Sequence, residues 1–282
     1  MHQDQDQIKN NPYKLVAIDM DGTLLSSDNK ISAENKAAIL AAMARGVKVV
    51  ICSGRSYHSL RLFAESIGTR SAGNYVIAFN GGMLLDAGTD EVIFETRMDR
   101  GLAMEIVEAA KPFEPNAATI VYRDVEHILV RPNNPHITAY VASTLVTPIV
   151  TDDINSLITD DVQKVLLGGY QKDLQAPAAF LREKFAGRCN MNFSGEYLFE
   201  CNELHTTKAA GLAALCRHLG LSMNEVIAIG DHYNDLSMIE AAGLGVCMSN
   251  GADGVKATAD YITTRDNNHS GVAEVLDKFI LQ

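Results

Sequence analysis

Two aspartates, Asp19 and Asp21, are separated by a single residue at the end of an apolar run that follows Lys14. Unpaired buried charge is costly, so two carboxylates at the end of a buried strand indicate that a cation meets them. A hard divalent cation with oxygen ligands would satisfy them, and Mg²⁺ is the leading candidate. With a metal bound, one carboxylate can attack phosphorus, as in enzymes that pass through an aspartyl phosphate. The alternative is a strand end capped by acidic turn residues that perform no chemistry.

Further polar residues follow expected strands or begin an expected helix: Ser53, Lys208, and the pair Asp231 and Asp235. They suit phosphoryl transfer, in which catalysis is mostly positioning and charge stabilisation. The Ser53 hydroxyl and nearby backbone N–H groups can hold phosphate oxygens, and Lys208 supplies a compact positive charge. A bound Mg²⁺ would offset the repulsion between a phosphate and the carboxylates.

Each of these elements has an ordinary interpretation when it is considered alone. Ser53 with the following Gly-Arg is typical of a turn, and Lys208 is typical of a solvated surface lysine. Asp231 and Asp235 also suit helix N-caps, and Asn80 followed by glycine is a common turn signal. Their joint occurrence at strand ends, in this order, favours a site.

The surrounding pattern predicts an α/β fold, because strands and helices alternate and the strands are apolar throughout. Such strands form a mostly parallel, doubly wound sheet with helices on both faces, and ligands bind beyond the carboxyl ends of the strands. Asp19, Ser53 and Asn80 fall at that edge. The expected strands are Leu15–Ile18, Val47–Cys52, Tyr75–Phe79, Tyr197–Cys201, Val226–Ile229, Leu244–Cys247 and Tyr261–Thr263, and the main helices Ser32–Arg45, one ending at Ile67, Lys208–Leu219, one ending at Ala242 and Gly271–Leu281.

The middle of the chain has a different pattern and predicts an inserted second α/β domain over residues 83–194. Residues 13–82 and 195–282 then form the catalytic domain, and residues 1–12 a disordered tail. The expected strands of the insertion are Glu91–Glu95, Ala118–Tyr122, His127–Val130, Val162–Gly168 and Cys189–Phe193, and its helices Arg100–Ala110, Ile137–Val146 and Leu174–Phe185.

Composition limits the classes of function. The chain has 282 residues, 47 % of them hydrophobic, and a net charge of −11, which disfavours binding to nucleic acid or an anionic membrane surface. No apolar stretch approaches the ~20 residues that span a bilayer, and no signal peptide is evident. Five scattered cysteines without a Cys-x-x-Cys pair favour a reducing cytoplasm over a disulfide framework or a zinc site. Nothing indicates the oligomeric state.

Taken together, these motifs resemble those of the haloacid dehalogenase superfamily of phosphatases, and most closely its Cof-like branch of sugar-phosphate phosphatases. The likeness extends from Lys14 to the last helix. It rests on Asp19-Met-Asp21-Gly-Thr-Leu-Leu, Ser53-Gly-Arg55, Asn80-Gly81, Lys208 and Gly230-Asp231-His-Tyr-Asn234-Asp235.

The resemblance implies a role for each motif residue and a Rossmann-like core whose inserted domain is a cap that selects the substrate. Asp19 would be the nucleophile, and Asp21 the general acid and then the base. Mg²⁺ would be held by the Asp19 carboxylate, the Asp21 backbone carbonyl and the Asp231 carboxylate, with Asp235 ordering its waters. Phosphate would be bound by the Met20 backbone, Ser53, Gly54, Lys208 and Asn234. The family usually has glycine where this chain has Ala209, which implies a small shift of Lys208.

The leading hypothesis is a Mg²⁺-dependent phosphatase of small phosphorylated metabolites, with sugar phosphates as the expected substrates. A phosphomutase uses the same aspartate pair but returns the phosphoryl group. A non-turnover phosphoryl-binding or signalling module is the third possibility. The position of Asp21, two residues after the nucleophile, and the inserted domain both favour an enzyme. His232 and Tyr233 could contact the substrate, and Arg123 and His127 could reach the leaving group from the insertion.

Overall fold

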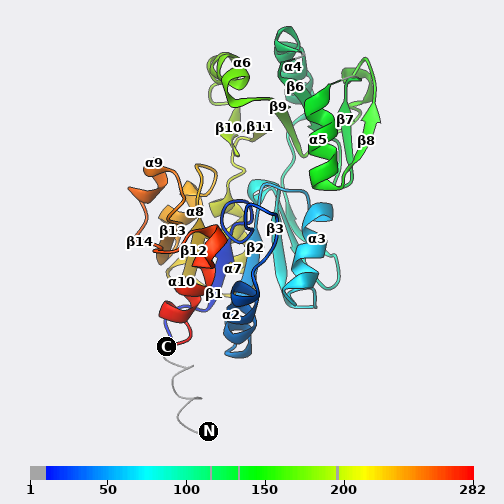
Figure 1. Ribbon diagram of the computed structural model, residues 1–282. Helices are drawn as coiled ribbons and strands as arrows, with labels where there is room; N and C mark the ends of the chain where they lie inside the picture. The colour runs from blue at the N-terminus through cyan, green and yellow to red at the C-terminus, as the bar shows by residue number, and fades with distance from the viewer. Residues whose placement is uncertain (1–10, 115, 133, 195–196) are drawn as a thin grey trace.

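The computed structural model describes residues 11–114, 116–132, 134–194 and 197–282, which form two sheets placed one above the other (Figure 1). The expected tail, residues 1–12, lies outside the described residues for all but its last two positions. No helix among the described residues combines the length and the apolarity needed to cross a membrane. The cytoplasmic location stays a prediction.

The lower sheet in Figure 1 has eight strands in the order β14-β13-β12-β1-β2-β3-β4-β5. The strands from β14 to β3 run parallel, and β4 pairs antiparallel with both of its neighbours. The bounds are β1 (Leu15–Ile18), β2 (Lys48–Cys52), β3 (Tyr75–Ala78), β4 (Met83–Asp86), β5 (Val92–Glu95), β12 (Val226–Gly230), β13 (Leu244–Cys247) and β14 (Tyr261–Ile262).

Helices cover both faces of this sheet because successive side chains of its buried strands point to opposite sides. Val16 and Ile18 belong to the apolar cluster shared with α2 and α10, whereas Leu15 and Ala17 belong to the cluster shared with α7. The helices of this layer are α2 (Ala33–Ala44), α3 (Tyr57–Ser66), α7 (Lys208–Leu219), α8 (Leu236–Ala241), α9 (Asp253–Lys256) and α10 (Gly271–Phe279). The structure therefore confirms the predicted doubly wound α/β core.

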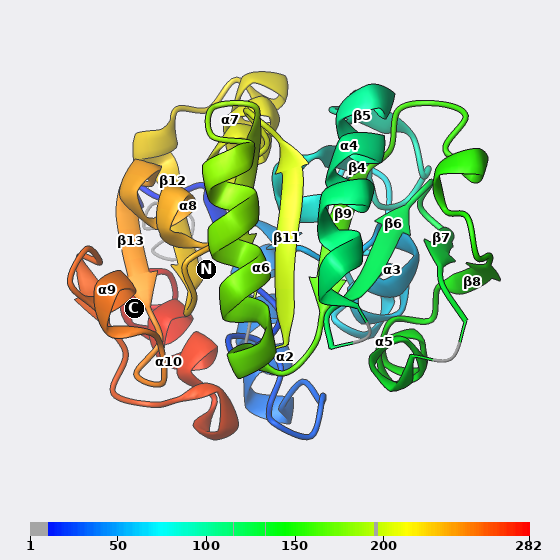
Figure 2. The same cartoon turned by 90° about the horizontal axis from the view of Figure 1, so that it is seen from above.

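The upper sheet has six strands in the order β10-β11-β9-β6-β7-β8, all antiparallel except for the pair β7 and β8. Viewed from above, α4 and α6 lie across this sheet (Figure 2). The strands are β6 (Ala118–Tyr122), β7 (His127–Val130), β8 (Thr147–Val150), β9 (Lys164–Gly168), β10 (Cys189–Phe193) and β11 (Leu198–Glu203), and the helices α4 (Arg100–Ala110), α5 (Pro135–Thr144) and α6 (Gln171–Lys184). Short 3-10 turns lie at Phe79–Gly81, Lys111–Phe113, Asn155–Leu157, Met223–Glu225 and Asn267–His269.

Strand pairing corrects the predicted boundaries of the insertion. Strands β4 and β5, expected within residues 83–194, extend the lower sheet, so the chain leaves that sheet only after Glu95. Strand β11, expected within residues 195–282, pairs with β9 and β10 in the upper sheet. The chain thus passes to the upper sheet, and returns to the lower sheet, at later residues than predicted. The reason is physical: a strand joins the partner that satisfies its backbone groups, and sequence position alone does not reveal that partner.

Candidate active site

The polar residues at the ends of the central strands gather at one edge of the lower sheet, beneath the upper sheet. Asp19 follows β1, Ser53 follows β2, Asn80 follows β3 and Asp231 follows β12. These strands are parallel neighbours, so their carboxyl ends meet at the same edge. Lys208 is the first residue of α7, whose start is fixed by the Thr207 side chain as N-cap.

Three buried or partly buried carboxylates surround one buried ammonium group. Oxygen atoms of Asp19, Asp231 and Asp235 lie within 4.8 Å of one another. The fully buried Lys208 Nζ donates hydrogen bonds of 2.5 Å to Asp19 Oδ1 and Asp235 Oδ1. One positive charge faces three negative charges, so the cluster is suited to hold an additional cation.

The carboxylates of this negatively charged cluster have raised pKa values. Burial, reinforced by Asp235, raises the pKa of Asp19 from 3.8 to about 7. Burial beside Asp19 likewise raises the pKa of Asp231 from 3.8 to about 8. Burial opposes the charged form of Lys208, but Asp19 and Asp235 together hold its pKa above the ordinary value. The carboxylates therefore hold protons tightly unless another cation compensates their charge.

The loop that carries Asp231 is held by its own side chains and by the loop after β1. Asp235 Oδ2 accepts hydrogen bonds from the backbone N–H groups of Asp231 (2.9 Å) and His232 (3.0 Å). The Thr23 hydroxyl donates to Asp231 Oδ1 at 3.1 Å. Gly22 has a φ of +80°, and a Cβ atom there would lie 2.4 Å from Asp231 Oδ2. Only glycine allows the two loops to approach so closely.

Asp21 lies on the open side of the cluster, where an arginine orients it. The guanidinium of Arg55 donates to both carboxylate oxygens, at 2.8 Å from Nε and 2.6 Å from Nη2. The Asp21 side chain is 52 % exposed, so it remains accessible while its plane is fixed. Arg55 was part of the quoted motif, but no pattern in the chain predicted its pairing with Asp21.

A tight loop after β2 holds Ser53 against the turn after β3. The Asn80 backbone N–H donates to the Ser53 carbonyl at 3.0 Å, and the Arg55 N–H donates to Ser53 Oγ at 3.2 Å. A Cβ atom on Gly54 would lie 2.9 Å from Asn80 Oδ1, so these residues pack directly together. Because Ser53 Oγ accepts a hydrogen bond from the backbone, its own proton is directed toward another acceptor.

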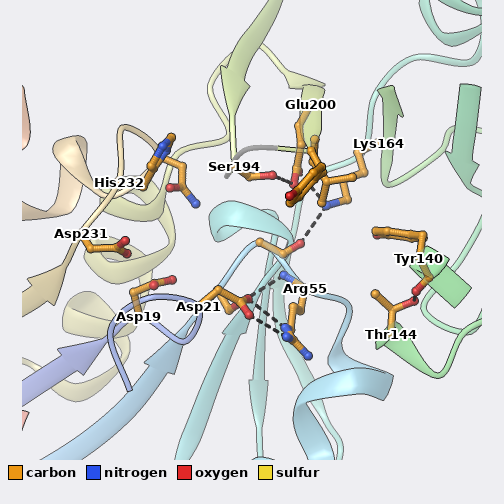
Figure 3. Close-up of a pocket in the computed structure, with 15 residues that line it drawn as sticks. Asp19, Asp21, Arg55, Tyr140, Thr144, Lys164, Ser194, Glu200, Asp231 and His232 are labelled. Atoms are coloured by element: carbon orange, nitrogen blue, oxygen red, sulfur yellow. Dashed lines mark hydrogen bonds and ion pairs between the residues drawn. The ribbon is translucent and has the colours of Figure 1, made fainter. Parts of the chain in front are cut away.

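A cavity of about 260 Å³ lies between the two sheets above these loops (Figure 3). Lys208 and Asp235 are fully buried beneath its floor, and Met20 is buried as well. The upper part of the wall comes from the second sheet and its connections. The cavity is lined by Asp19, Asp21, Ser53, Gly54, Arg55, Tyr140, Thr144, Lys164, Ser194, Tyr197, Leu198, Glu200, Asp231, His232 and Asn234.

The lining includes most of the predicted site residues and several that the sequence analysis missed. His232 lines the cavity, whereas Arg123 and His127 bond to Asp124 and are not among the lining residues. The missed residues from the second sheet and α5 carry no motif, because strands and helices of ordinary pattern bring them to the cavity. They are Tyr140, Thr144, Lys164, Ser194, Tyr197, Leu198 and Glu200.

The fold and the carboxylate cluster define an α/β protein with a candidate cation-binding site at the carboxyl ends of its strands, and comparison with known proteins names its family. A profile of haloacid dehalogenase-like hydrolases matches residues 16–276. The chain is 34 % identical over 269 residues to the 5-amino-6-(5-phospho-D-ribitylamino)uracil phosphatase YcsE of Bacillus subtilis, covering 95 % of this chain and 96 % of that protein. It is 29 % identical over 285 residues to the phosphatase YwpJ of the same organism, covering 93 % and 98 %.

A solved structure supports the same family. The crystal structure of a haloacid dehalogenase-like hydrolase from Bacteroides thetaiotaomicron superposes with a TM-score of 0.83 and 31 % identity, covering 94 % of this chain and 99 % of that one. The chain therefore belongs to the haloacid dehalogenase-like hydrolases, in their Cof-like branch, which confirms the family predicted from its motifs. It is a phosphatase of small phosphorylated metabolites.

Proposed function

We propose that this phosphatase is Mg²⁺-dependent, acts through an aspartyl phosphate on Asp19, and takes sugar phosphates or related phosphorylated polyols. One observation carries the proposal. The carboxylates of Asp19, Asp231 and Asp235 converge within 4.8 Å around a single buried ammonium at the floor of a small cavity.

The donor set fits a hard divalent cation, since all of its side-chain ligands are oxygen atoms. The Asp19 and Asp231 carboxylates and the Asp21 backbone carbonyl would hold the metal. Asp235 already accepts hydrogen bonds on both oxygens, from Lys208 and from two backbone N–H groups, so it would order the metal's waters rather than bind it directly. When bound, Mg²⁺ would offset the repulsion between phosphate and carboxylates and polarise a phosphoryl oxygen.

The protein's own groups account for both chemical steps. An Asp19 oxygen attacks phosphorus, and the ester oxygen leaves with a proton from Asp21. Asp21, then a carboxylate, takes a proton from water as the water attacks phosphorus, which releases inorganic phosphate and regenerates Asp19. The two hydrogen bonds from Arg55 would hold the orientation of the Asp21 carboxyl group for both proton transfers.

The groups proposed to bind the phosphate surround the floor of the cavity. Ser53, Gly54 and Asn234 line it, and the ammonium of Lys208 lies directly beneath, bonded to the attacking carboxylate. With the Met20 backbone they would hold the phosphoryl oxygens where charge develops in the transition state.

The cavity and one relative support a small polyhydroxylated leaving group. About 260 Å³ is less than the space that drug-sized ligands occupy. The relative YcsE is named for a phosphorylated ribityl compound, a phosphate ester of a sugar alcohol. The aromatic side chains of Tyr140 and Tyr197 on the wall provide apolar surface for the carbon skeleton.

A direct test measures inorganic phosphate release from a panel of phosphorylated sugars, sugar alcohols, nucleotides and cofactors, with Mg²⁺ and with a chelator. We expect metal-dependent release, fastest with the sugar and sugar-alcohol esters. An isomerised ester with little free phosphate would establish a mutase instead. A stable phosphoryl group on Asp19 without turnover would establish a signalling module.

A further inference from the structure

A buried ion pair from the upper sheet reaches the loops at the floor of the cavity. Lys164 on β9 and Glu200 on β11 have side chains only 1 % and 2 % exposed, and Lys164 Nζ lies 2.6 Å from Glu200 Oε2. In Figure 3 both lie above Asp19, Asp21 and Arg55. A buried ion pair adds little net stability compared with apolar residues of similar volume. Its placement therefore suggests a role in positioning its neighbours.

Each member of the pair bonds to a group of the lower sheet's loops. Lys164 Nζ donates to the Gly54 carbonyl at 2.8 Å. Glu200 Oε2 accepts from Asn80 Nδ2 at 2.9 Å, and Asn80 Oδ1 in turn accepts from Asn234 Nδ2 at 3.2 Å. Two of the groups proposed to bind phosphate, Gly54 and Asn234, are thus one and two hydrogen bonds away from the pair.

The bond from Lys164 continues through one peptide unit to Ser53. The Gly54 carbonyl and the Arg55 N–H belong to the same peptide, and that N–H donates to Ser53 Oγ at 3.2 Å. Hydrogen bonds in series polarise one another, so the Lys164 ammonium strengthens the Arg55 N–H as a donor. Ser53 Oγ is thereby fixed as an acceptor from the backbone, and its hydroxyl proton is left for an oxygen in the cavity.

The bond from Glu200 holds a strained turn. Phe79 and Asn80 are both left-handed, with φ of 52° and 56°, and neither is glycine. Such a conformation persists only where the surrounding structure holds it in place. The Asn80 side chain, placed between Glu200 and Asn234, connects this turn to the upper sheet on one side and to the Asp231 loop on the other.

We infer that Lys164 and Glu200 are positioning residues through which the cap domain sets the geometry of the phosphate-binding groups Ser53, Gly54 and Asn234. This inference rests on the proposed function of those three groups. It assigns to the upper sheet a part in binding the phosphate itself, common to every substrate, in addition to any selection of the leaving group.

The test compares Lys164→Met and Glu200→Gln with the unaltered enzyme, using inorganic phosphate as the competitive inhibitor. We expect the inhibition constant for phosphate to rise about tenfold in each variant, the loss of roughly one charge-assisted hydrogen bond. The value of kcat/KM should fall by a similar factor for every ester hydrolysed. Lys164→Arg keeps the charge and a donor, so it should restore most of the affinity for phosphate.

Arg188→Met provides a matched control, because it breaks the exposed pair of Arg188 with Glu105 in the same domain and should leave phosphate inhibition unchanged. Glu200→Gln alone decides the question if Lys164→Met does not fold. An unchanged inhibition constant in a folded variant would overturn the inference, and so would a loss confined to some esters. Failure of the proposed function has a different signature, namely no phosphate release by the unaltered protein.

Discussion

At the scale of single residues, the two aspartates after β1 have different surroundings, and their substitution should reduce activity to different extents. Asp19 is buried against Lys208, and its replacement by asparagine should reduce turnover to background because the proposed attacking oxygen is lost. Asp21→Asn should reduce turnover by about 10²–10⁴-fold, the usual contribution of a general acid–base group. Phosphate release measures both effects, and circular dichroism verifies the fold. Asp28→Asn alters an exposed carboxylate of the same loop and should retain activity. Normal turnover by Asp19→Asn would refute the mechanism.

The same cluster links the stability of the metal-free protein to pH. In the fold the pKa values of Asp19 and Asp231 are about 7 and about 8, against an ordinary value of 3.8, because both groups are buried beside other carboxylates. At a pH between 3.8 and the raised pKa values, the folded state holds more protons than the unfolded state. This contribution is therefore fully present below a pH of about 4 and is lost progressively as the pH rises from there through the folded pKa values of about 7 and about 8.

A divalent cation replaces those protons, so Mg²⁺ should raise Tm more at about pH 8 than at about pH 6. At a concentration ~100-fold above Kd the gain is about 2.7 kcal/mol, or roughly 4–5 °C for a chain of this size. Thermal unfolding with and without Mg²⁺ at the two pH values gives the comparison. Asp231→Asn should remove most of the difference. An equal or larger rise at the lower pH would contradict the assignment of this cluster as the metal site.

At the scale of elements, the turn after β3 depends on glycine at position 81. Gly81 has a φ of +95°, and a Cβ atom there would lie 2.0 Å from the carbonyl oxygen of Thr207, the N-cap of α7. Gly220, at the other end of α7, has a φ of +68° and nothing within 4 Å of such an atom. Alanine at either position costs about 1–2 kcal/mol in backbone strain, and the overlap at Gly81 adds about 1–3 kcal/mol.

Urea denaturation of Gly81→Ala and Gly220→Ala measures this difference directly. Gly81→Ala should also reduce phosphatase activity in the folded protein, because it displaces the start of α7 and with it Lys208. Gly220→Ala should reduce the stability of the protein without reducing its phosphatase activity. Equal losses of stability in the two variants would show that the close approach of the turn to Thr207 does not constrain α7.

The same elements show what the sequence pattern could and could not predict. Helices α4 and α7 and strand β13 have the predicted bounds, because their periodicity and end signals are local. Strand β4 directly follows the turn at Asn80 and was missed, since its antiparallel partners define it. Strand β8 was missed because it contains Pro148 and is mostly exposed, features that argue against a strand except at a sheet edge, where it lies.

At the scale of the whole molecule, the motif residues were predictable because the parallel sheet brings strand ends together by topology. The wall of the cavity was not, since it depends on contacts between distant segments. Lys164 and Gly54 lie 110 residues apart, and Lys164 occupies a strand of ordinary pattern. No spacing rule in the chain connects them. Docking of one sheet over the other creates this contact, so only the assembled structure reveals it.

The two domains should unfold together, because their apolar cores are continuous. One cluster of buried side chains includes Phe79 from the lower layer and Ile120, Tyr122 and Leu166 from the upper sheet, and the rings of Phe79 and Tyr122 meet edge to face at 5.4 Å. Calorimetry should show a single transition. Tyr122→Ala removes the ring at this junction and should lower Tm and separate the transition into two. Two resolved transitions in the unaltered protein would mean that the cap is stabilised by its own cluster under α4 and α6 and is only loosely coupled to the catalytic domain.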